Sequence, residues 1–256
     1  MGNNVEIVTV DATNLAKCGF FCYKSKKKSE GYQRKLKWLE ERFAEGMKIK
    51  ILYENGRSVG FIEYIPGEFA WRAVSAPNYM LIHCLWVVGR GKGKGYGSRL
   101  LNGCIEDARK AGHDGVAMVT SRRVWLAGPE LLLKHGFEPL DEAPPTFELL
   151  VKKFKEAPSP AFPKDWDERA RQYGTGLTII RSDQCPYIND AVSTVLEAGH
   201  EMGIGTRVVE LESAREVQGL APSAYGTFSI VYNGALLSYH YLLKKELLSR
   251  LNQRSE

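Results

Sequence analysis

A glycine-rich turn between a strand and a helix is the feature that most constrains this chain. Residues 85 to 101, LWVVGRGKGKGYGSRLL, pass from an apolar run into glycines that alternate with basic residues, and then into helical spacing. Glycine accepts positive φ and has no Cβ, so the main chain of such a turn can approach a ligand closely. Because the turn's amides and the helix amino terminus would face the same point, the segment predicts a phosphate site. The alternative is a flexible turn that binds nothing.

The spacing of the glycines distinguishes between the known phosphate-binding turns. No Lys-Ser or Lys-Thr pair closes the turn, which excludes the P-loop pattern. The glycines step by two, and no acidic residue ends a strand near 115 to 121, so the dinucleotide pattern of a Rossmann fold fails as well. Residues 92 to 97, KGKGYG, fit another pattern. It consists of a basic or amide residue, any two residues, a glycine, any one residue and a second glycine.

With this pattern the chain resembles the GNAT superfamily of N-acetyltransferases, whose signature turn binds the pyrophosphate of acetyl-CoA. Leu85 and Val87 precede the turn at the family's usual offset, and Lys92, where Arg or Gln is commoner, keeps a positive charge at this position. The resemblance implies acetyl-CoA as the cosubstrate, with its pantetheine arm added to the strand edge and its pyrophosphate on the turn. The cofactor-binding residues that it implies are Leu85, Trp86, Val87, Lys92, Gly93, Lys94, Gly95, Tyr96, Gly97 and Ser98.

Hydrophobic periodicity predicts an α/β fold with a mixed sheet in the first part of the chain. The expected strands are 5–10, 49–54, 58–65, 80–88, 115–120 and 147–154, and the expected helices are 12–43, 98–110 and 129–135. Asn55 and Gly56 predict a tight hairpin turn. This order is the one that GNAT domains show, and the resemblance, which covers about residues 4 to 154, implies that the fourth strand splays from the fifth.

Prolines at 158, 160 and 163 predict a linker. We therefore expect a GNAT N-acetyltransferase domain at 1–155, a linker at 156–175 and a smaller domain at 176–256. From Leu177 the predicted order βαβαββα resembles the thioredoxin-like fold. The stretches FIEYIPGEFAWRAV and IHCLWVVGRGKGKGYG resemble the YoaP-like acetyltransferases, which join these two kinds of domain.

Cys185 is a possible reactive thiol. It follows the first strand of the second domain, where the redox motif of glutaredoxins falls, and a helix amino terminus favours the thiolate. Ile188 replaces the second cysteine of that motif, and Gly226 and Thr227 precede the third strand without the usual cis-proline, so dithiol exchange is excluded. An inert cysteine, a monothiol that carries a substrate, and a domain that completes the acceptor pocket are the alternatives.

The chemistry that the resemblance implies is direct attack of a neutral amine on the thioester, which requires a base. Glu63 and His83, on neighbouring expected strands, are the candidate catalytic residues. The alternatives are that Glu63 faces solvent and that His83 is a core histidine. Leu132 stands where the family has its usual acid, a tyrosine, and Trp125 where it often has an asparagine that contacts CoA. A sensor that binds acetyl-CoA without turnover is therefore one alternative function, and a monothiol redox or substrate-carrier protein that acts through Cys185 is the other.

The composition limits the classes of partner that the protein is expected to bind. A net charge of +5 from scattered basic residues does not indicate nucleic acid, and no apolar run of 18 residues indicates a membrane span. Five unevenly placed cysteines and the lack of a signal-like amino terminus predict free thiols, no metal and a cytoplasmic location. The expected acceptor is a small-molecule amine.

Overall fold

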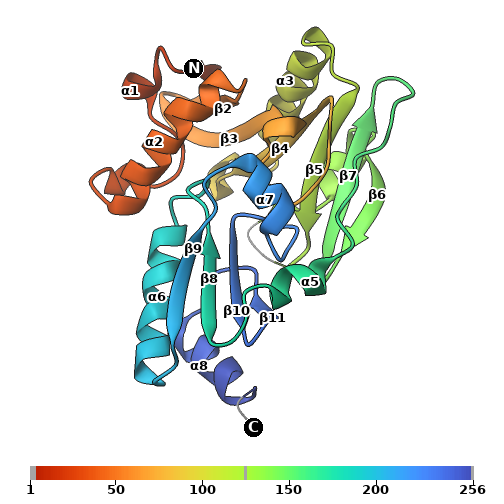
Figure 1. The fold of residues 1–256 in the computed structure, drawn as a ribbon. Helices are drawn as coiled ribbons and strands as arrows, with labels where there is room; N and C mark the ends of the chain where they lie inside the picture. The colour runs from red at the N-terminus through yellow and green to blue at the C-terminus, as the bar shows by residue number, and fades with distance from the viewer. Residues whose placement is uncertain (1–3, 124–125, 255–256) are drawn as a thin grey trace. The chain divides into compact units, whose positions relative to one another are not determined.

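The computed structural model describes residues 4–123 and 126–254. The chain divides into two compact units (Figure 1). The first consists of residues 1–25, 36–70 and 74–162, and the second of residues 26–35, 71–73 and 163–256. The second unit thus takes two short segments from the early part of the chain. No helix of the described residues is long and apolar enough to cross a lipid bilayer.

A seven-stranded mixed sheet forms the first unit. Its order is β1-β2-β3-β4-β5-β7-β6, and only β4 and β5 pair in parallel. The strands are β1 Val5–Val10, β2 Lys48–Glu54, β3 Arg57–Pro66, β4 Tyr79–Val87, β5 Gly115–Ser121, β6 Glu138–Ala143 and β7 Phe147–Lys153. Asn55 and Gly56 form the expected turn, both with positive φ. β6 is a strand that the pattern did not predict.

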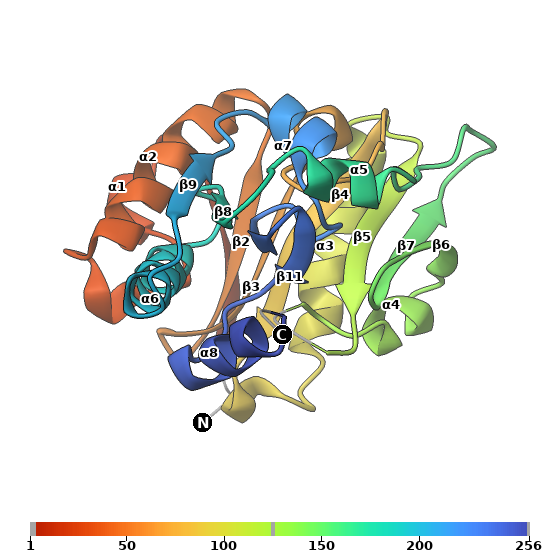
Figure 2. The same ribbon diagram turned by 60° about the horizontal axis from the view of Figure 1, so that its bottom comes forward.

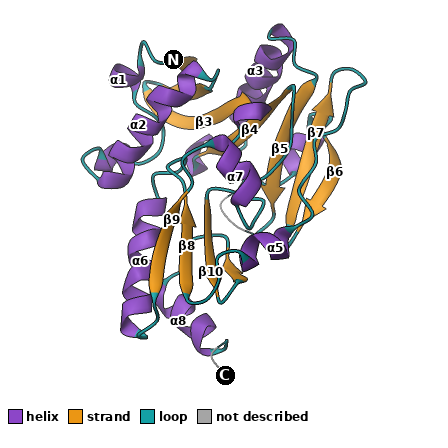
Figure 3. Cartoon of the chain, in the orientation of Figure 1, coloured by secondary structure: helices purple, strands orange, loops and turns teal. Residues whose placement is uncertain are grey.

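Helices cover this sheet (Figure 3). They are α1 Leu15–Cys18, α2 Glu30–Ala44, α3 Tyr96–Lys110 and α4 Glu130–Lys134. The helix expected over 12–43 is in fact broken, because α1 ends at Gly19, whose φ is 60°, and the chain becomes helical again only at Lys24–Lys26 and Glu30. The predicted apolar positions of α3 are buried in the core, namely Leu100, Leu101, Cys104, Ile105 and Ala108.

The second unit contains a four-stranded sheet of order β11-β10-β8-β9. β8 is parallel to β9, and β10 is antiparallel to β8 and β11. The elements are α5 Trp166–Arg171, β8 Leu177–Arg181, α6 Ile188–Glu201, β9 Thr206–Glu210, α7 Ala214–Leu220, β10 Phe228–Tyr232, β11 Ala235–Ser238 and α8 Lys244–Asn252. α6 contacts β8, β9 and α8 (Figure 2). α5 lies inside the segment that the prolines mark as a linker.

Candidate active site

The sheet of the first unit opens between β4 and β5. The two strands pair only where Tyr79–Ile82 runs beside Gly115–Met118. Beyond these residues β4 stays paired with β3 alone, and β5 stays paired with β7 alone. The predicted cofactor-binding residues at 85–87 all lie on this diverging stretch of β4. Leu85 is buried in the core, whereas the Trp86 side chain is 48% exposed.

The glycine turn leads from β4 into α3. Gly93 and Gly95 have φ of 78° and 75°, a conformation that favours glycine, and a Cβ on either would point into open space. The amide of Arg99 donates to the carbonyl of Gly95, so the three preceding amides, of residues 96–98, belong to the first turn and have no acceptor within the helix. The turn therefore fits a phosphate group, which would meet open main chain and a helix amino terminus.

Glu54, at the end of β2, fixes this turn. Its carboxylate accepts hydrogen bonds from Lys94 Nζ at 2.8 Å and from the Tyr96 hydroxyl at 2.5 Å. These bonds, that from Lys94 foremost, hold the pKa of Glu54 below its usual range. Lys92 Nζ lies 5.7 Å from the centroid of the Trp86 ring. The charge of Lys94 is thus balanced by Glu54, while Lys92 lies over an exposed aromatic ring.

Glu63 and His83 lie side by side under a β-bulge. Glu63 pairs with Cys84 and Tyr64 with Ile82, so His83 is the extra residue of β4. A bulge turns a side chain out of the strand's alternation, and here His83 Nδ1 lies 3.4 Å from Glu63 Oε1. Glu63 is 3% exposed, so the alternative of a solvent-facing Glu63 is wrong, whereas the 0% exposure of His83 also fits the alternative of a core histidine. The Trp38 ring of α2 lies 6.3 Å, centroid to centroid, from the imidazole.

α4 contributes packing rather than an acid. Leu132, which replaces the usual tyrosine, is 1% exposed and belongs to the core cluster that α3 forms with the sheet. Trp125 lies outside the described residues. At the end of α4, His135 Nε2 lies 2.9 Å from Ser98 Oγ and so links α4 to the first turn of α3. Neither His135 nor Glu54 was found from the sequence, because each meets its partner across the fold and no local pattern announces it.

Cys185 lies in the second unit, half-buried between β8 and α6. Its carbonyl accepts a hydrogen bond from the amide of Ile188. The preceding residue, Gln184, contacts Thr227 at 3.0 Å and Arg72 Nη1 at 3.3 Å, and Arg72 Nη1 also donates to Thr227 Oγ1 at 2.7 Å. Arg72 is 2% exposed. A buried polar network therefore borders the cysteine loop on the side where the sequence lacks a cis-proline.

Known proteins resemble the chain over the same segments. The Acetyltransferase (GNAT) family profile matches residues 10–125, which contain the open sheet and the glycine turn. The "Uncharacterized N-acetyltransferase YoaP" of Bacillus subtilis (strain 168) is 32% identical over 252 residues, covering 96% of this chain and 98% of that protein.

Two further similarities are partial. The L-methionine sulfoximine/L-methionine sulfone acetyltransferase of Salmonella typhimurium is 33% identical over 89 residues, covering 34% of this chain and 50% of that protein. The crystal structure of PaiA N-acetyltransferase from Thermoplasma acidophilum with coenzyme A matches 59% of this chain and 99% of that one, at 16% identity and a TM-score of 0.43. The similarity to YoaP spans nearly the whole of both proteins, and this chain therefore belongs to the GNAT family of N-acetyltransferases, in its YoaP-like group.

Proposed function

We propose that this chain transfers the acetyl group of acetyl-CoA directly to the amine of a small molecule. The observation that carries the proposal is the position of the Glu63–His83 pair. His83 lies where β4 parts from β5, on the strand that continues into the glycine turn, and Glu63 faces it from the neighbouring β3. An ionisable pair next to the opening that would hold the cosubstrate is suited to accept a proton from an attacking amine.

The cosubstrate would supply a thioester whose carbonyl carbon the amine attacks. The turn at 89–95 and the first turn of α3 would hold the pyrophosphate through main-chain N–H groups. The edge of β4 at 85–87 would hold the pantetheine arm, as an added strand. Glu54 supports the turn by keeping Lys94 and Tyr96 in place.

Proton removal is assigned to the Glu63–His83 pair. Nδ1 of His83 is the nitrogen that faces Glu63, so a hydrogen bond from Nδ1–H to the carboxylate would orient the ring and leave Nε2 as the proton acceptor. Glu63 would then stabilise the imidazolium that forms. Leu132 cannot donate a proton to the leaving thiol, so we assign that proton to solvent.

The acceptor is proposed to be a small amine. One partial relative is named for L-methionine sulfoximine and L-methionine sulfone, which are amino-acid derivatives. We further infer a thioredoxin-like fold for the second unit, from its strand order and its single parallel pair. Cytoplasmic location and reactivity of the Cys185 thiol stay predictions.

The test of the base uses Glu63→Gln and His83→Ala. Each variant is incubated with acetyl-CoA and a panel of amines while released thiol is followed. We expect kcat to fall by roughly 10²-fold or more and the alkaline rise of the rate to flatten, with unchanged acetyl-CoA affinity. Unchanged pH profiles in both variants would refute the assignment. Tight acetyl-CoA binding without turnover of any amine by the unaltered protein would instead favour the sensor.

A further inference from the structure

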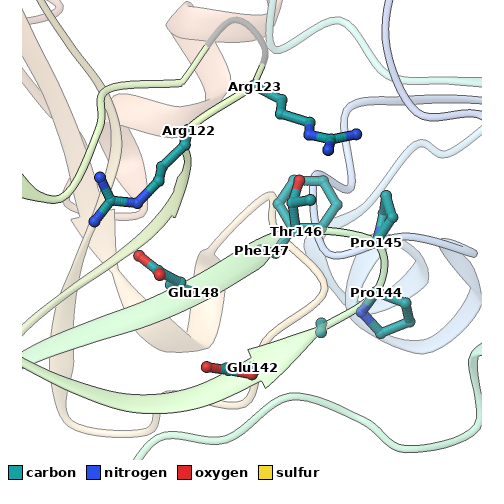
Figure 4. Close-up of a pocket in the computed structure, with 9 residues that line it drawn as sticks. Arg122, Arg123, Glu142, Pro144, Pro145, Thr146, Phe147 and Glu148 are labelled. Carbon is teal, nitrogen blue, oxygen red and sulfur yellow. The ribbon is translucent and has the colours of Figure 1, made fainter.

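A cavity of the first unit lies apart from the glycine turn, between the end of β5 and the β6–β7 hairpin (Figure 4). Its volume of about 550 Å³ is in the range of small-molecule sites. Apolar walls come from the hairpin, and two arginines follow β5. The lining residues that matter here are Arg122, Arg123, Pro145, Thr146, Phe147 and Glu148.

The two arginines differ in their partners. Arg122 Nη1 forms an ion pair of 2.9 Å with Glu130 of α4. The guanidinium of Arg123 has no hydrogen bond or ion pair with any residue in 4–123 or 126–254; only its main-chain amide is bonded, to Ser121 Oγ. The two side chains point in opposite directions in Figure 4. Arg123 therefore offers its charge to the cavity, whereas the charge of Arg122 is already balanced.

Strand register places this region on the same face of the sheet as the proposed base. Ile65 pairs with Leu81, and Leu81 pairs with Ala117, so these three side chains share one face. Glu63 is two residues from Ile65 and Ser121 is four residues from Ala117, and alternation returns both to that face. The cavity thus begins on the face where the amine would be deprotonated.

The same register separates the acidic side chains of the hairpin from the face of Ser121, the last residue of β5. Phe147 pairs with Ser121 and shares its face, but Glu148 pairs with Thr120 and belongs to the opposite one. Figure 4 shows Glu142 and Glu148 on the side of Arg122. The neighbours of Arg123 in the cavity are therefore a hydroxyl group and apolar side chains. Thr146 Oγ1 lies 3.1 Å from Ser121 Oγ, and Phe147 and Pro145 form the wall.

We propose that Arg123 binds a carboxylate of the acceptor, so that the acceptor is an amine that also carries a carboxylate. The inference rests on the proposed function. The planar guanidinium matches a carboxylate through two parallel hydrogen bonds, and Pro145 in the cavity lining gives apolar surface for the carbon chain between the two groups. Pairing does not fix the distance from the base to Arg123, because β4 and β5 separate after Ile82 and Met118 and β5 ends at Ser121. The spacing of amine and carboxylate is therefore a variable of the test.

The experiment compares each carboxylate with its own amide, using the full-length protein and acetyl-CoA. The probes are glycine, γ-aminobutyrate and ε-aminocaproate, with the corresponding carboxamides, and released thiol is followed. We expect kcat/KM to be at least tenfold higher for the carboxylate in the pair whose length fits. Arg123→Gln should abolish that preference by raising KM for the carboxylate roughly tenfold or more, with the KM for acetyl-CoA unchanged. Arg171→Gln, which removes one exposed positive charge from the second unit, is the control and should keep the preference.

A binding measurement separates this inference from the catalytic proposal. The same probes are titrated calorimetrically into the protein saturated with CoA. If the protein binds a carboxylate probe and Arg123→Gln weakens that binding at least tenfold, the inference is supported. This holds even if no probe is acetylated, and in that case only the proposed catalysis fails. Equal binding and turnover of carboxylates and carboxamides, or equal losses for both in Arg123→Gln, would overturn it.

Discussion

Two carboxylates, Glu54 and Asp107, tie the sheet to α3 through hydroxyl and ammonium groups. For Glu54 the prediction concerns affinity: Glu54→Gln should raise the KM for acetyl-CoA several-fold, because Lys94 and Tyr96 would lose the acceptor that holds the turn. Tyr96→Phe, which removes one of these bonds and keeps the ring, should give a smaller change in the same direction. Steady-state kinetics at varied acetyl-CoA measure both. An unchanged KM in Glu54→Gln would show that the turn holds its shape unaided.

For Asp107 the prediction concerns stability. Its carboxylate accepts a hydrogen bond of 2.6 Å from Tyr64 and lies 3.2 Å from the ammonium groups of Lys48 and Lys50. Burial opposes the charge, but the Tyr64 hydrogen bond and the lysine charges outweigh it and hold the pKa of Asp107 below its usual value. Burial raises the pKa of Tyr64, which therefore stays protonated and keeps donating.

The folded-state pKa of Asp107 lies below its unfolded-state pKa. The contribution of Asp107 to the free energy of unfolding is therefore complete at pH values above the unfolded-state pKa, and it is lost as the pH falls through the folded-state pKa. Asp107→Asn should lower the free energy of unfolding by about 1–2 kcal/mol at neutral pH, and the difference from the unaltered protein should shrink below about pH 4. Urea unfolding at several pH values measures this. A difference that does not vary with pH would contradict the electrostatic account.

Among the elements, the glycine turn gives a clear separation of binding from folding. Gly95 and Gly112 both have positive φ, 75° and 78°, and in both a Cβ would meet open space, but only Gly95 lies in the turn. Gly95→Val should weaken acetyl-CoA binding at least tenfold by blocking approach to the main chain. Gly112→Val, at the other end of α3, should bear the same strain of about 1–2 kcal/mol and keep the affinity. Similar losses of acetyl-CoA affinity in both variants would refute the assignment of the phosphate site to the glycine turn.

The elements also show what a local pattern predicts. Most strands and α3 follow from the sequence, because alternation and helical spacing are short-range signals. The pattern missed β6, whose residues EPLDEA include a proline and are mostly exposed, so that apolar alternation is weak. It also merged α1 and α2, because the apolar spacing continues across Gly19, where the backbone turns.

At the scale of the whole molecule, the second unit depends on a segment that is remote in the sequence. Arg72 is buried among Gln184, Thr227 and the Tyr225 ring, and a Cβ on Gly226 would lie 2.9 Å from the Cα of Arg72. Arg72→Ala should therefore lower the free energy of unfolding of this unit by about 1.5–3 kcal/mol, the value of a hydrogen bond to a charged group. Circular dichroism during denaturation measures the loss.

Arg171→Ala is the matched control for Arg72. The Arg171 side chain is 65% exposed and, among the described residues, forms an ion pair with Glu168 on α5, so its removal should change stability by less than about 0.5 kcal/mol. Equal effects of the two substitutions would mean that the buried network around Arg72 adds nothing to stability.

The sequence by itself determined the glycine turn, the strand that enters it, the order of most elements and the membership of the family, since all of these are contained in residues near one another along the chain. Tertiary structure alone decided that a bulge sets His83 against Glu63, that Glu54 holds the turn, and that Arg123 faces a cavity beside Phe147. These contacts depend on strand register and on side chains brought together from distant strands. One residue of register reverses the face of every side chain in a strand, and no local spacing specifies it.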